Sequence, residues 1–455
     1  MKLYYSKAFD TENGFFLYDG LVNCLYAISE DVYNIIQSED VITNSQKFYY
    51  DEYIKKNNIR DATIPVEIDI AHDYTADSIK NFIDNHRKLL ILSVTSQCNL
   101  RCTYCIYQEK FENMDKNKQI KNFEYSMTFD TAKKAIDQMV EKSLNLRHIH
   151  IGFYGGESLL EFELIKKCVS YVNSRNIGVE FGFGITTNGT LLNNKDIRDY
   201  LSEHNFSVSV SLDGPKKIHD RYRFTCEREE TFDIIISNLK QWYAEYPTYF
   251  LQKVSINAVY APPFHHKAMD DFFEALPIEF TYGPLSSTNY FENHMSNISN
   301  EYANKIVECD NVNLYENDVS YYKNFHVGNS GGNDDFKLIL PGGACMPVFM
   351  RWYVNSKGEY YPCERIEESD DYNIGNVDEG VNFEKILKLM DRYVNIAKKC
   401  ENCWAVRLCT RCHSNIHEDC DNYRNRLEED YKYYIENIIG HKNSEAELDK
   451  LRLYL

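Results

Sequence analysis

Along residues 88–283, short apolar runs alternate with longer segments in which apolar residues recur at helical spacing. The expected strands are residues 88–97, 147–154, 178–187, 206–212, 252–260 and 278–283. The expected helices are residues 128–142, 158–175, 193–204, 231–245 and 266–275. This alternation predicts an α/β fold with a parallel sheet, in which ligands lie at the carboxyl ends of the strands.

The first part of the chain, residues 1–85, has a different pattern and is expected to form a separate small module. Residues 14–20 and 24–28 are predicted to be short strands joined by a turn, and residues 30–37 and 46–56 are predicted to be helices. Strands followed by helices predict a winged-helix-like unit.

Composition limits the class of protein further. The chain has 455 residues and 43% hydrophobic residues, enough for a sizeable core. It has no long apolar run and no signal-peptide pattern at its start, so we expect a cytoplasmic protein without a membrane partner. The net charge of −19, without a basic stripe, argues against a nucleic-acid partner.

Ten of the 14 cysteines fall in clustered spacings, which favours metal ligation over disulfides in a reducing compartment. The first group is a C-x3-C-x2-C loop of Cys98, Cys102 and Cys105, directly after the first predicted strand. Three thiolates on one short loop can bind an iron–sulfur cluster and leave one iron open to a non-protein ligand. Buried or disulfide-bonded cysteines are the alternative.

This loop, with Tyr104 just before its last cysteine, resembles the signature of radical S-adenosylmethionine (SAM) enzymes. The resemblance implies that the three cysteines bind a 4Fe–4S cluster whose fourth iron chelates SAM. One electron then cleaves SAM to methionine and a 5′-deoxyadenosyl radical, which abstracts a hydrogen from the substrate. The resemblance also implies a partial (β/α)6 barrel, with a radical SAM core over residues 88–300.

Further SAM contacts are expected where the later strands end. Gly155 and Gly156 let the backbone approach a ligand closely, and the carboxylate of Glu157, the next residue, can accept a hydrogen bond from an ammonium group. By resemblance this segment binds the SAM amino group, and Arg223 can clamp a carboxylate. The alternative for Arg223 is an ordinary surface arginine, and the alternative for Ser211 is a serine that only forms a turn. The residues expected to contact SAM are Tyr104, Gly155, Gly156, Glu157, Asn188, Ser211 and Arg223.

A second, denser group of cysteines lies near the C-terminus. Its members are Cys345, Cys363, Cys400, Cys403, Cys409, Cys412 and Cys420. The two C-x2-C pairs within residues 400–412 could also make a four-thiolate zinc site. The region resembles the SPASM domain, expected here over residues 340–425, which binds two auxiliary 4Fe–4S clusters. The last gap of its C-x2-C-x5-C-x2-C block is one residue shorter than is usual in that family.

The SPASM resemblance implies a ligand set for each auxiliary cluster, and three 4Fe–4S clusters in all. The first auxiliary cluster would be bound by Cys345, Cys363 and Cys412, and the second by Cys400, Cys403, Cys409 and Cys420. With only three protein ligands, the first auxiliary cluster would have an open iron that could bind a substrate thiolate. Alternatively, this cluster would only relay electrons.

Glu364 follows Cys363, at the place where sulfatase maturases carry an aspartate that acts as general base. Glutamate is chemically similar to aspartate, but its side chain is one methylene longer. Glu364 is therefore predicted either to act as the general base or to be an ordinary surface residue. The last helix, expected within residues 426–455 and beginning at residues 427–430, is predicted to pack on the barrel or cap it.

Together these resemblances predict a peptide maturase, similar to thioether-forming sactipeptide and ranthipeptide maturases. The N-terminal module resembles a leader-peptide recognition domain, to which an extended leader would add as a strand. The expected partners are a ribosomally made, Cys-rich precursor peptide with a leader and an electron donor such as flavodoxin or ferredoxin. The alternatives are an anaerobic sulfatase maturase, which forms formylglycine, and a non-catalytic Fe–S or zinc scaffold.

Overall fold

The computed structural model divides the chain into two compact units, neither of which is continuous in sequence. Unit 1 comprises Met1–Asp73, Tyr315–Cys345 and Arg392–Leu455, and unit 2 comprises Tyr74–Leu314 and Met346–Asp391. The structure describes residues 1–22, 24–38, 40–66, 75–85, 88–105, 107, 126–143, 146–175, 178–260, 266–276, 279–284, 348, 351–366, 368–398, 400–406, 408–409 and 420–439. Among these residues, no helix is both long enough and apolar enough to cross a membrane.

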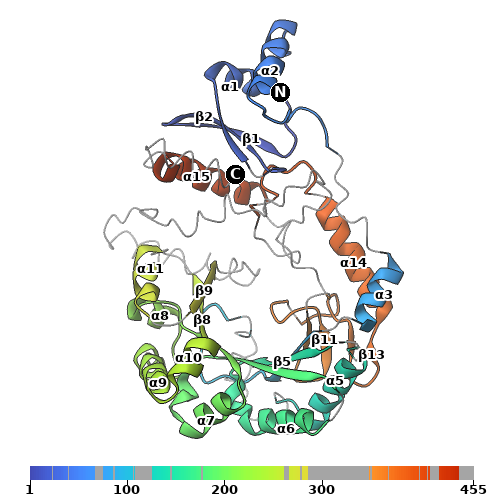
Figure 1. Cartoon of the computed structure of the whole chain (residues 1–455), viewed down its shortest axis with the longest axis vertical. Helices are drawn as coiled ribbons and strands as arrows, with labels where there is room; N and C mark the ends of the chain where they lie inside the picture. Colours follow the sequence, from blue (N-terminus) through green and yellow to red (C-terminus); the bar gives the residue numbers. More distant parts are fainter. Residues whose placement is uncertain are drawn as a thin grey trace. The chain divides into compact units, whose positions relative to one another are not determined.

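The core of unit 2 is a parallel sheet, which confirms all six strands predicted for this region. Neighbouring strands follow one another in sequence order, and helices cover one side of the sheet (Figure 1). The strands are β4 (Leu89–Thr95), β5 (His148–Gly155), β6 (Glu180–Thr187), β7 (Ser207–Ser211), β8 (Val254–Tyr260) and β9 (Glu279–Pro284). Because all six are parallel, their carboxyl ends meet at one edge.

The helices between these strands are also found where helical spacing predicts them. They are α5 (Phe129–Glu141), α6 (Phe162–Asn173), α7 (Lys195–Glu203), α9 (Phe232–Glu245) and α11 (His266–Glu274). Thr128 caps α5 and Asn194 caps α7 through side-chain oxygens, as Thr and Asn often do. The sequence pattern did not predict α3 (Ala76–Asn85), α8 (Lys216–Tyr222) or α10 (Pro247–Lys253).

Four short strands extend the sheet beyond β4, and the sequence pattern missed them because each has only two or three residues. β10 (Trp352–Val354) pairs in parallel with β4, so that Tyr353 lies opposite Ile91. β11 (Glu359–Tyr361), β12 (Gly375–Asn376) and β13 (Gly380–Val381) follow in antiparallel order. This extension brings the segment after β11, which contains Cys363, into the same unit as the first cysteine loop.

The two faces of the parallel sheet differ in side-chain size. On β5, Ile149, Ile151 and Phe153 are buried, while the residues between them point to the other face and are only partly buried. The apolar faces of α5 and α6 are buried in the same core. On the face away from these helices, small residues predominate: Gly152, Gly182, Gly184, Ser209 and Ser255.

Unit 1 contains the N-terminal module, a three-stranded antiparallel sheet followed by two helices. The predicted strands β2 (Gly14–Asp19) and β3 (Cys24–Ile28) and the predicted helices α1 (Glu30–Gln37) and α2 (Asn44–Lys56) are present. An additional strand, β1 (Ser6–Thr11), pairs with β2 and was not predicted.

A C-terminal helix, α15 (Cys420–Tyr433), packs on this N-terminal sheet (Figure 1). It begins seven residues before the predicted start at Leu427. A short π-helical stretch, Tyr434–Ile439, continues it, and α14 (Phe383–Lys398) precedes the cysteine segment. The predicted partner of this helix was the barrel, and its packing on the N-terminal sheet was not predicted. The apolar core shared by the sheet, the cysteine segment and α15 consists of Phe9, Tyr18, Trp404, Ala405, Leu408, Leu427, Tyr431, Tyr434 and Ile435.

Candidate active site

The three thiols of the first cysteine loop lie on the segment that directly follows the carboxyl end of β4. Loss of hydration raises the pKa of Cys98, Cys102 and Cys105, that of Cys105 to about 12. The charge of Cys102 raises the pKa of the other two further, so the three side chains lie within electrostatic reach of one another. Thiols in such a site stay neutral unless a cation is bound, and a metal cluster supplies that cation.

The glycine pair after β5 crosses directly over the segment that leads into this loop. The N–H of Gly156 donates to the carbonyl of Thr95 (2.8 Å), and the N–H of Glu157 donates to the carbonyl of Gln97 (2.8 Å). A methyl group on Gly155 would stand 2.0 Å from the Thr95 oxygen, and one on Gly156 would stand 2.1 Å from the Gln97 oxygen. The close approach that glycine permits here is therefore made with the protein's own backbone.

The other side of the loop pairs with the end of α8 and the residues that follow it. The N–H of Arg101 donates to the carbonyl of Phe224 (2.8 Å), and the N–H of Thr103 donates to that of Tyr222 (3.0 Å). The cysteine loop is thus fixed by backbone hydrogen bonds on two sides, which holds its thiols in one arrangement.

Glu157 is fully buried and accepts hydrogen bonds from three donors of the protein. Its Oε1 accepts from the Thr187 hydroxyl (2.7 Å) and the Leu159 N–H (3.0 Å), and its Oε2 accepts from the Asn188 N–H (2.7 Å). Burial raises the pKa of Glu157, and these hydrogen bonds oppose that shift. The carboxylate therefore ties the end of β6 to the end of β5; contact with the SAM amino group stays a prediction.

Asn188 links the end of β6 to the cysteine loop itself. Its side-chain amide lies 3.8 Å from the sulfur of Cys98 and donates to Asn99 (2.8 Å). Hydrogen bonds to sulfur tune the reduction potential of iron–sulfur clusters. The structure therefore places this predicted SAM-binding residue where it would also influence the cluster.

Arg223 is buried among Tyr104, Asp213 and Cys102. Its Nη1 donates to the Tyr104 hydroxyl (2.5 Å) and lies 3.8 Å from the Asp213 carboxylate, to which the same hydroxyl donates. Its Nε is buried without a hydrogen-bond partner, as is the hydroxyl of Thr103 in the loop. Because such atoms are rare in folded proteins, they leave hydrogen-bonding capacity that a polar ligand beside the loop would use.

Asp213 and His219 support this arginine and were not singled out from the sequence. Burial raises the pKa of Asp213, and the charge of Arg223 opposes the shift. The Asp213 N–H donates to Nδ1 of His219 (3.2 Å), and Nε2 of His219 lies 3.0 Å from the Thr231 hydroxyl. Burial lowers the pKa of His219 to about 3, so the ring is neutral. Only the S-L-D-G-P turn after β7 could have pointed to Asp213.

The remaining predicted SAM contact, Ser211, ends β7 opposite Asn257 of β8 and is partly buried. It lies on the face of small residues described above, and its role stays a prediction.

Cys363 and Glu364 follow β11 in the same unit. Nη1 of Arg351 donates to Oε1 of Glu364 (2.6 Å), and the Cys363 thiol donates to Oε2 (3.4 Å). Both carboxylate oxygens of this candidate base are therefore engaged by protein groups. Burial raises the pKa of Tyr154 on β5, and the charges of Glu364, Cys105 and Cys363 raise it further. Tyr154 thus lies within electrostatic reach of both cysteine-bearing segments.

Four thiols of the second cysteine group lie in unit 1. Burial raises the pKa of Cys400 to about 12, and the charges of Cys403, Cys409 and Cys420 raise it as well. Cys403, Cys409 and Cys420 therefore lie within electrostatic reach of Cys400. That the four bind one auxiliary cluster stays a prediction. Cys345 and Cys412, predicted for the other auxiliary cluster, lie outside the described residues. In the described part of the chain, no group of three or more His, Cys, Asp or Glu side chains could hold a single metal ion.

Comparison with known families bears directly on the first loop. The profile of the radical SAM superfamily matches residues 92–276, a range that contains Cys98, Cys102 and Cys105. The chain contains a radical SAM domain. It is therefore an enzyme, and a radical SAM domain implies SAM and a 4Fe–4S cluster as cofactors. The prediction made from the C-x3-C-x2-C loop is confirmed at this level.

The relatives of this radical SAM protein include sulfatase maturases. A cysteine-type anaerobic sulfatase-maturating enzyme of Clostridium novyi (strain NT) is 29% identical over 349 residues, which cover 70% of this chain and 86% of the relative. A cysteine-type enzyme of Clostridium perfringens (strain 13 / Type A) is 26% identical over 378 residues, 76% of this chain and 95% of the relative. Native anSMEcpe, solved with bound AdoMet and Kp18Cys peptide, is similar in fold: its TM-score is 0.51 at 19% identity, covering 71% of this chain and 88% of that one.

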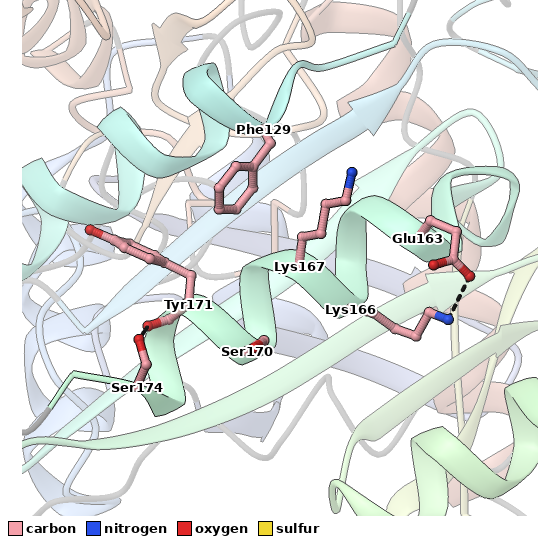
Figure 2. Close-up of a pocket in the computed structure, with 7 residues that line it drawn as sticks. All are labelled: Phe129, Glu163, Lys166, Lys167, Ser170, Tyr171 and Ser174. Atoms are coloured by element: carbon pink, nitrogen blue, oxygen red, sulfur yellow. Dashed lines mark hydrogen bonds and ion pairs between the residues drawn. The ribbon is translucent and has the colours of Figure 1, made fainter.

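The hollow shown in Figure 2 lies elsewhere on the radical SAM domain, on the outer flank of α5 and α6. Its lining residues are Phe129, Glu163, Lys166, Lys167, Ser170, Tyr171 and Ser174. On α6 these alternate with the residues buried against the core, so the hollow faces away from the sheet. Lys166 pairs with Glu163 (2.5 Å), and no cysteine lines it. It belongs to the helical surface and is separate from the cysteine loop.

Proposed function

We propose that this radical SAM enzyme modifies a ribosomally made peptide, and that it joins a cysteine sulfur to a carbon in a thioether crosslink. The single observation that carries the proposal is the N-terminal module: a three-stranded sheet with two helices shares one compact unit with a second set of thiols. β3 lies at the edge of this sheet, and an extended leader peptide would add to such an edge as a further strand.

The residues at the first loop fit the cofactors of a radical SAM enzyme. Cys98, Cys102 and Cys105 would hold the cluster, and the buried, unpaired Nε of Arg223 fits a polar ligand such as SAM. When bound, the two together supply one-electron cleavage of SAM and hydrogen abstraction from the peptide. The chain's own residues fix the loop, hold a positive charge beside it and keep water away.

Formation of the C–S bond, the second half of the reaction, requires an electron acceptor, and the second cysteine group would hold one. Joining S–H and C–H into a C–S bond removes two hydrogens, and one electron must leave the peptide after the first hydrogen is abstracted. An auxiliary cluster bound by Cys400, Cys403, Cys409 and Cys420 would accept that electron. In this proposal the region is a SPASM domain with two auxiliary clusters, and flavodoxin or ferredoxin returns electrons to the first cluster.

Sulfatase maturation is the second candidate, and it is favoured by the identity and coverage of the Clostridium relatives. That reaction needs a general base near the substrate cysteine. Glu364 is less suited to this role, because its Oε1 already accepts a hydrogen bond from Arg351. The peptide partner is common to both candidates, so the product distinguishes them.

The test is a reaction of the anaerobically reconstituted enzyme with a Cys-rich peptide carrying its leader and, separately, with a sulfatase-derived cysteine peptide. We expect 5′-deoxyadenosine in the first reaction, together with a peptide that has lost two hydrogens and retained its sulfur. Release of sulfur with formation of an aldehyde from the second peptide alone would establish the sulfatase-maturase candidate. Absence of 5′-deoxyadenosine from fully iron-loaded enzyme with either peptide would contradict both.

A further inference from the structure

The N-terminal sheet and the second cysteine group share one apolar core, although nearly 400 residues separate them in sequence. Tyr5 and Leu21, on either side of the first two strands, pack with Cys400 and Val406, and Cys403 and Cys409 border the same cluster. Tyr5 is 1% exposed, and Leu21 is also 1% exposed. Residues next to the strands of the sheet therefore pack directly around these thiols.

Tyr5 also lies beside the loop between two of the cysteines. Its hydroxyl is within reach of the backbone N–H of Asn402 and of the charges of Cys400 and Cys403. Tyr5 (φ 59°) and Asn402 (φ 64°) are both in the left-handed backbone region. Asparagine adopts that conformation readily, whereas a tyrosine holds it only where its surroundings enforce it, so the backbone of Tyr5 is held by its neighbours.

A glycine lies at a close approach of the two segments. A methyl group on Gly20 would stand 2.7 Å from the carbonyl oxygen of Trp404 and 2.9 Å from that of Tyr5. Both atoms belong to the backbone, so a larger residue at this position would displace one segment from the other. Arg424 of α15 lies on a further side of these thiols, within electrostatic reach of Cys403.

We propose that assembly of the auxiliary cluster on Cys400, Cys403, Cys409 and Cys420 and folding of the N-terminal sheet are thermodynamically coupled, with Tyr5 as the positioning residue between them. The cluster binds only the folded arrangement of its thiols, so its binding free energy stabilises every segment that holds that arrangement. The inference rests on the proposed function, because it takes the four thiols as cluster ligands. It adds that only the iron-loaded enzyme presents an ordered sheet to the peptide.

The test uses the full-length chain and two separate readouts. Iron content and the EPR signals of the reduced protein report the clusters, and amide hydrogen exchange reports the order of β1, β2 and β3. Wild type is compared with Cys403→Ser, Tyr5→Phe and Gly20→Ala. Phe48→Ala, on the exposed face of α2 (68% exposed), is the matched control within the same module.

We expect Cys403→Ser to lose the iron of one cluster and to exchange at least about tenfold faster in all three strands. Tyr5→Phe keeps the ring and removes the hydroxyl that lies beside the Asn402 N–H, so we expect about five- to tenfold faster exchange in β1 and a changed EPR signal or potential of this cluster. Gly20→Ala should lose part of the iron. Phe48→Ala should match wild type in both readouts.

Two different results would overturn the inference, and they can be told apart. If Cys403→Ser loses iron while exchange in β1, β2 and β3 is unchanged, the coupling is absent and the proposed function is unaffected. If Cys403→Ser keeps the full iron content, these thiols bind no cluster, and the cofactor assignment within the proposed function fails together with the inference.

Discussion

The two groups of thiols are surrounded by different kinds of side chains. Around the loop of residues 98–105 in unit 2, the neighbours are buried polar groups: Glu157, Asn188, Asp213 and Arg223. Around the segment of residues 400–409 in unit 1, they are mainly aromatic and aliphatic groups of the N-terminal sheet and α15. One group of thiols is held by hydrogen bonds and charges, and the other by an apolar core.

This difference matches what each site would have to do. A site that binds a zwitterionic, positively charged cofactor needs fixed polar groups to replace the cofactor's water. A cluster that only exchanges electrons needs little more than thiolates and a dry environment. The polar surroundings therefore favour the first loop as the place of chemistry, and perturbation of each surrounding should affect one site and leave the other unchanged.

The largest effect is expected from Gly156→Ala in unit 2. The added methyl group would stand 2.1 Å from the Gln97 oxygen and 2.8 Å from the Ser96 oxygen, so the segment leading into Cys98 must move. We expect a loss of at least about a hundredfold in the rate of SAM cleavage, because small displacements of reacting groups have effects of that size. Production of 5′-deoxyadenosine under reducing conditions is the measurement.

The matched control is Gly152→Ala on the same strand. Its methyl group would meet Ile91 at 3.5 Å, an ordinary contact distance, so activity should stay close to that of wild type. The EPR signal of the auxiliary cluster in unit 1 should be unchanged in both variants. Equal activity of the two variants would show that the crossing over residues 95–97 is not what positions the loop.

The sequence predicted the local features of the first site well. Strand and helix periods, and the placement of the cysteine loop after β4, depend on residues close together in the chain, and the structure agrees with them. It did not predict what Gly155 and Gly156 contact. A glycine pair indicates that other atoms come close to the backbone at these positions. Only the fold shows that these atoms are the carbonyl oxygens of Thr95 and Gln97.

The periodicity of the sequence could not predict contacts between residues that are far apart in the chain. The contacts of Arg223 with Tyr104 and of Tyr5 with Asn402 join positions more than 100 residues apart. Strands of two or three residues, such as β10 and β11, carry too few positions for an alternating pattern to be detected. The packing of α15 on the N-terminal sheet was missed because an apolar helix face does not identify its partner.

The next effect in size is expected from Arg223→Met. Removing this buried charge leaves Asp213 without its partner, which costs about 3–5 kcal/mol in the free energy of unfolding of unit 2. Arg424→Met at the other site should cost much less, because that side chain is 35% exposed and its charge is screened. Thermal unfolding under anaerobic conditions is the measurement. The double variant Arg223→Met/Asp213→Asn should recover part of the loss; no recovery would mean that the arginine acts by packing alone.

The polar surroundings of the first loop also predict a pH dependence that resides in unit 2. The folded pKa of His219 is about 3, well below the value of about 6.5 in an unfolded chain. Between these values the unfolded chain binds more protons, so the free energy of unfolding decreases as the pH falls. From pH 7 to pH 5 we expect a loss of about 2 kcal/mol from this residue. His219→Gln should have a shallower pH dependence than wild type; identical slopes would show that His219 is not the titrating group.

The smallest effect, and the most specific, is expected from Asn188→Ala. The variant loses the amide that lies 3.8 Å from the Cys98 sulfur, so the first cluster should have a lower reduction potential, while stability falls by only about 1 kcal/mol. Asn194→Ala is the matched control: it removes the N-cap of α7 at a similar cost in stability but touches no sulfur. Redox titration followed by EPR should show a shift in the first variant alone, with the auxiliary cluster unchanged in both. A shift of equal size in the two variants would mean that general loosening of the fold, rather than the hydrogen bond to sulfur, sets the potential.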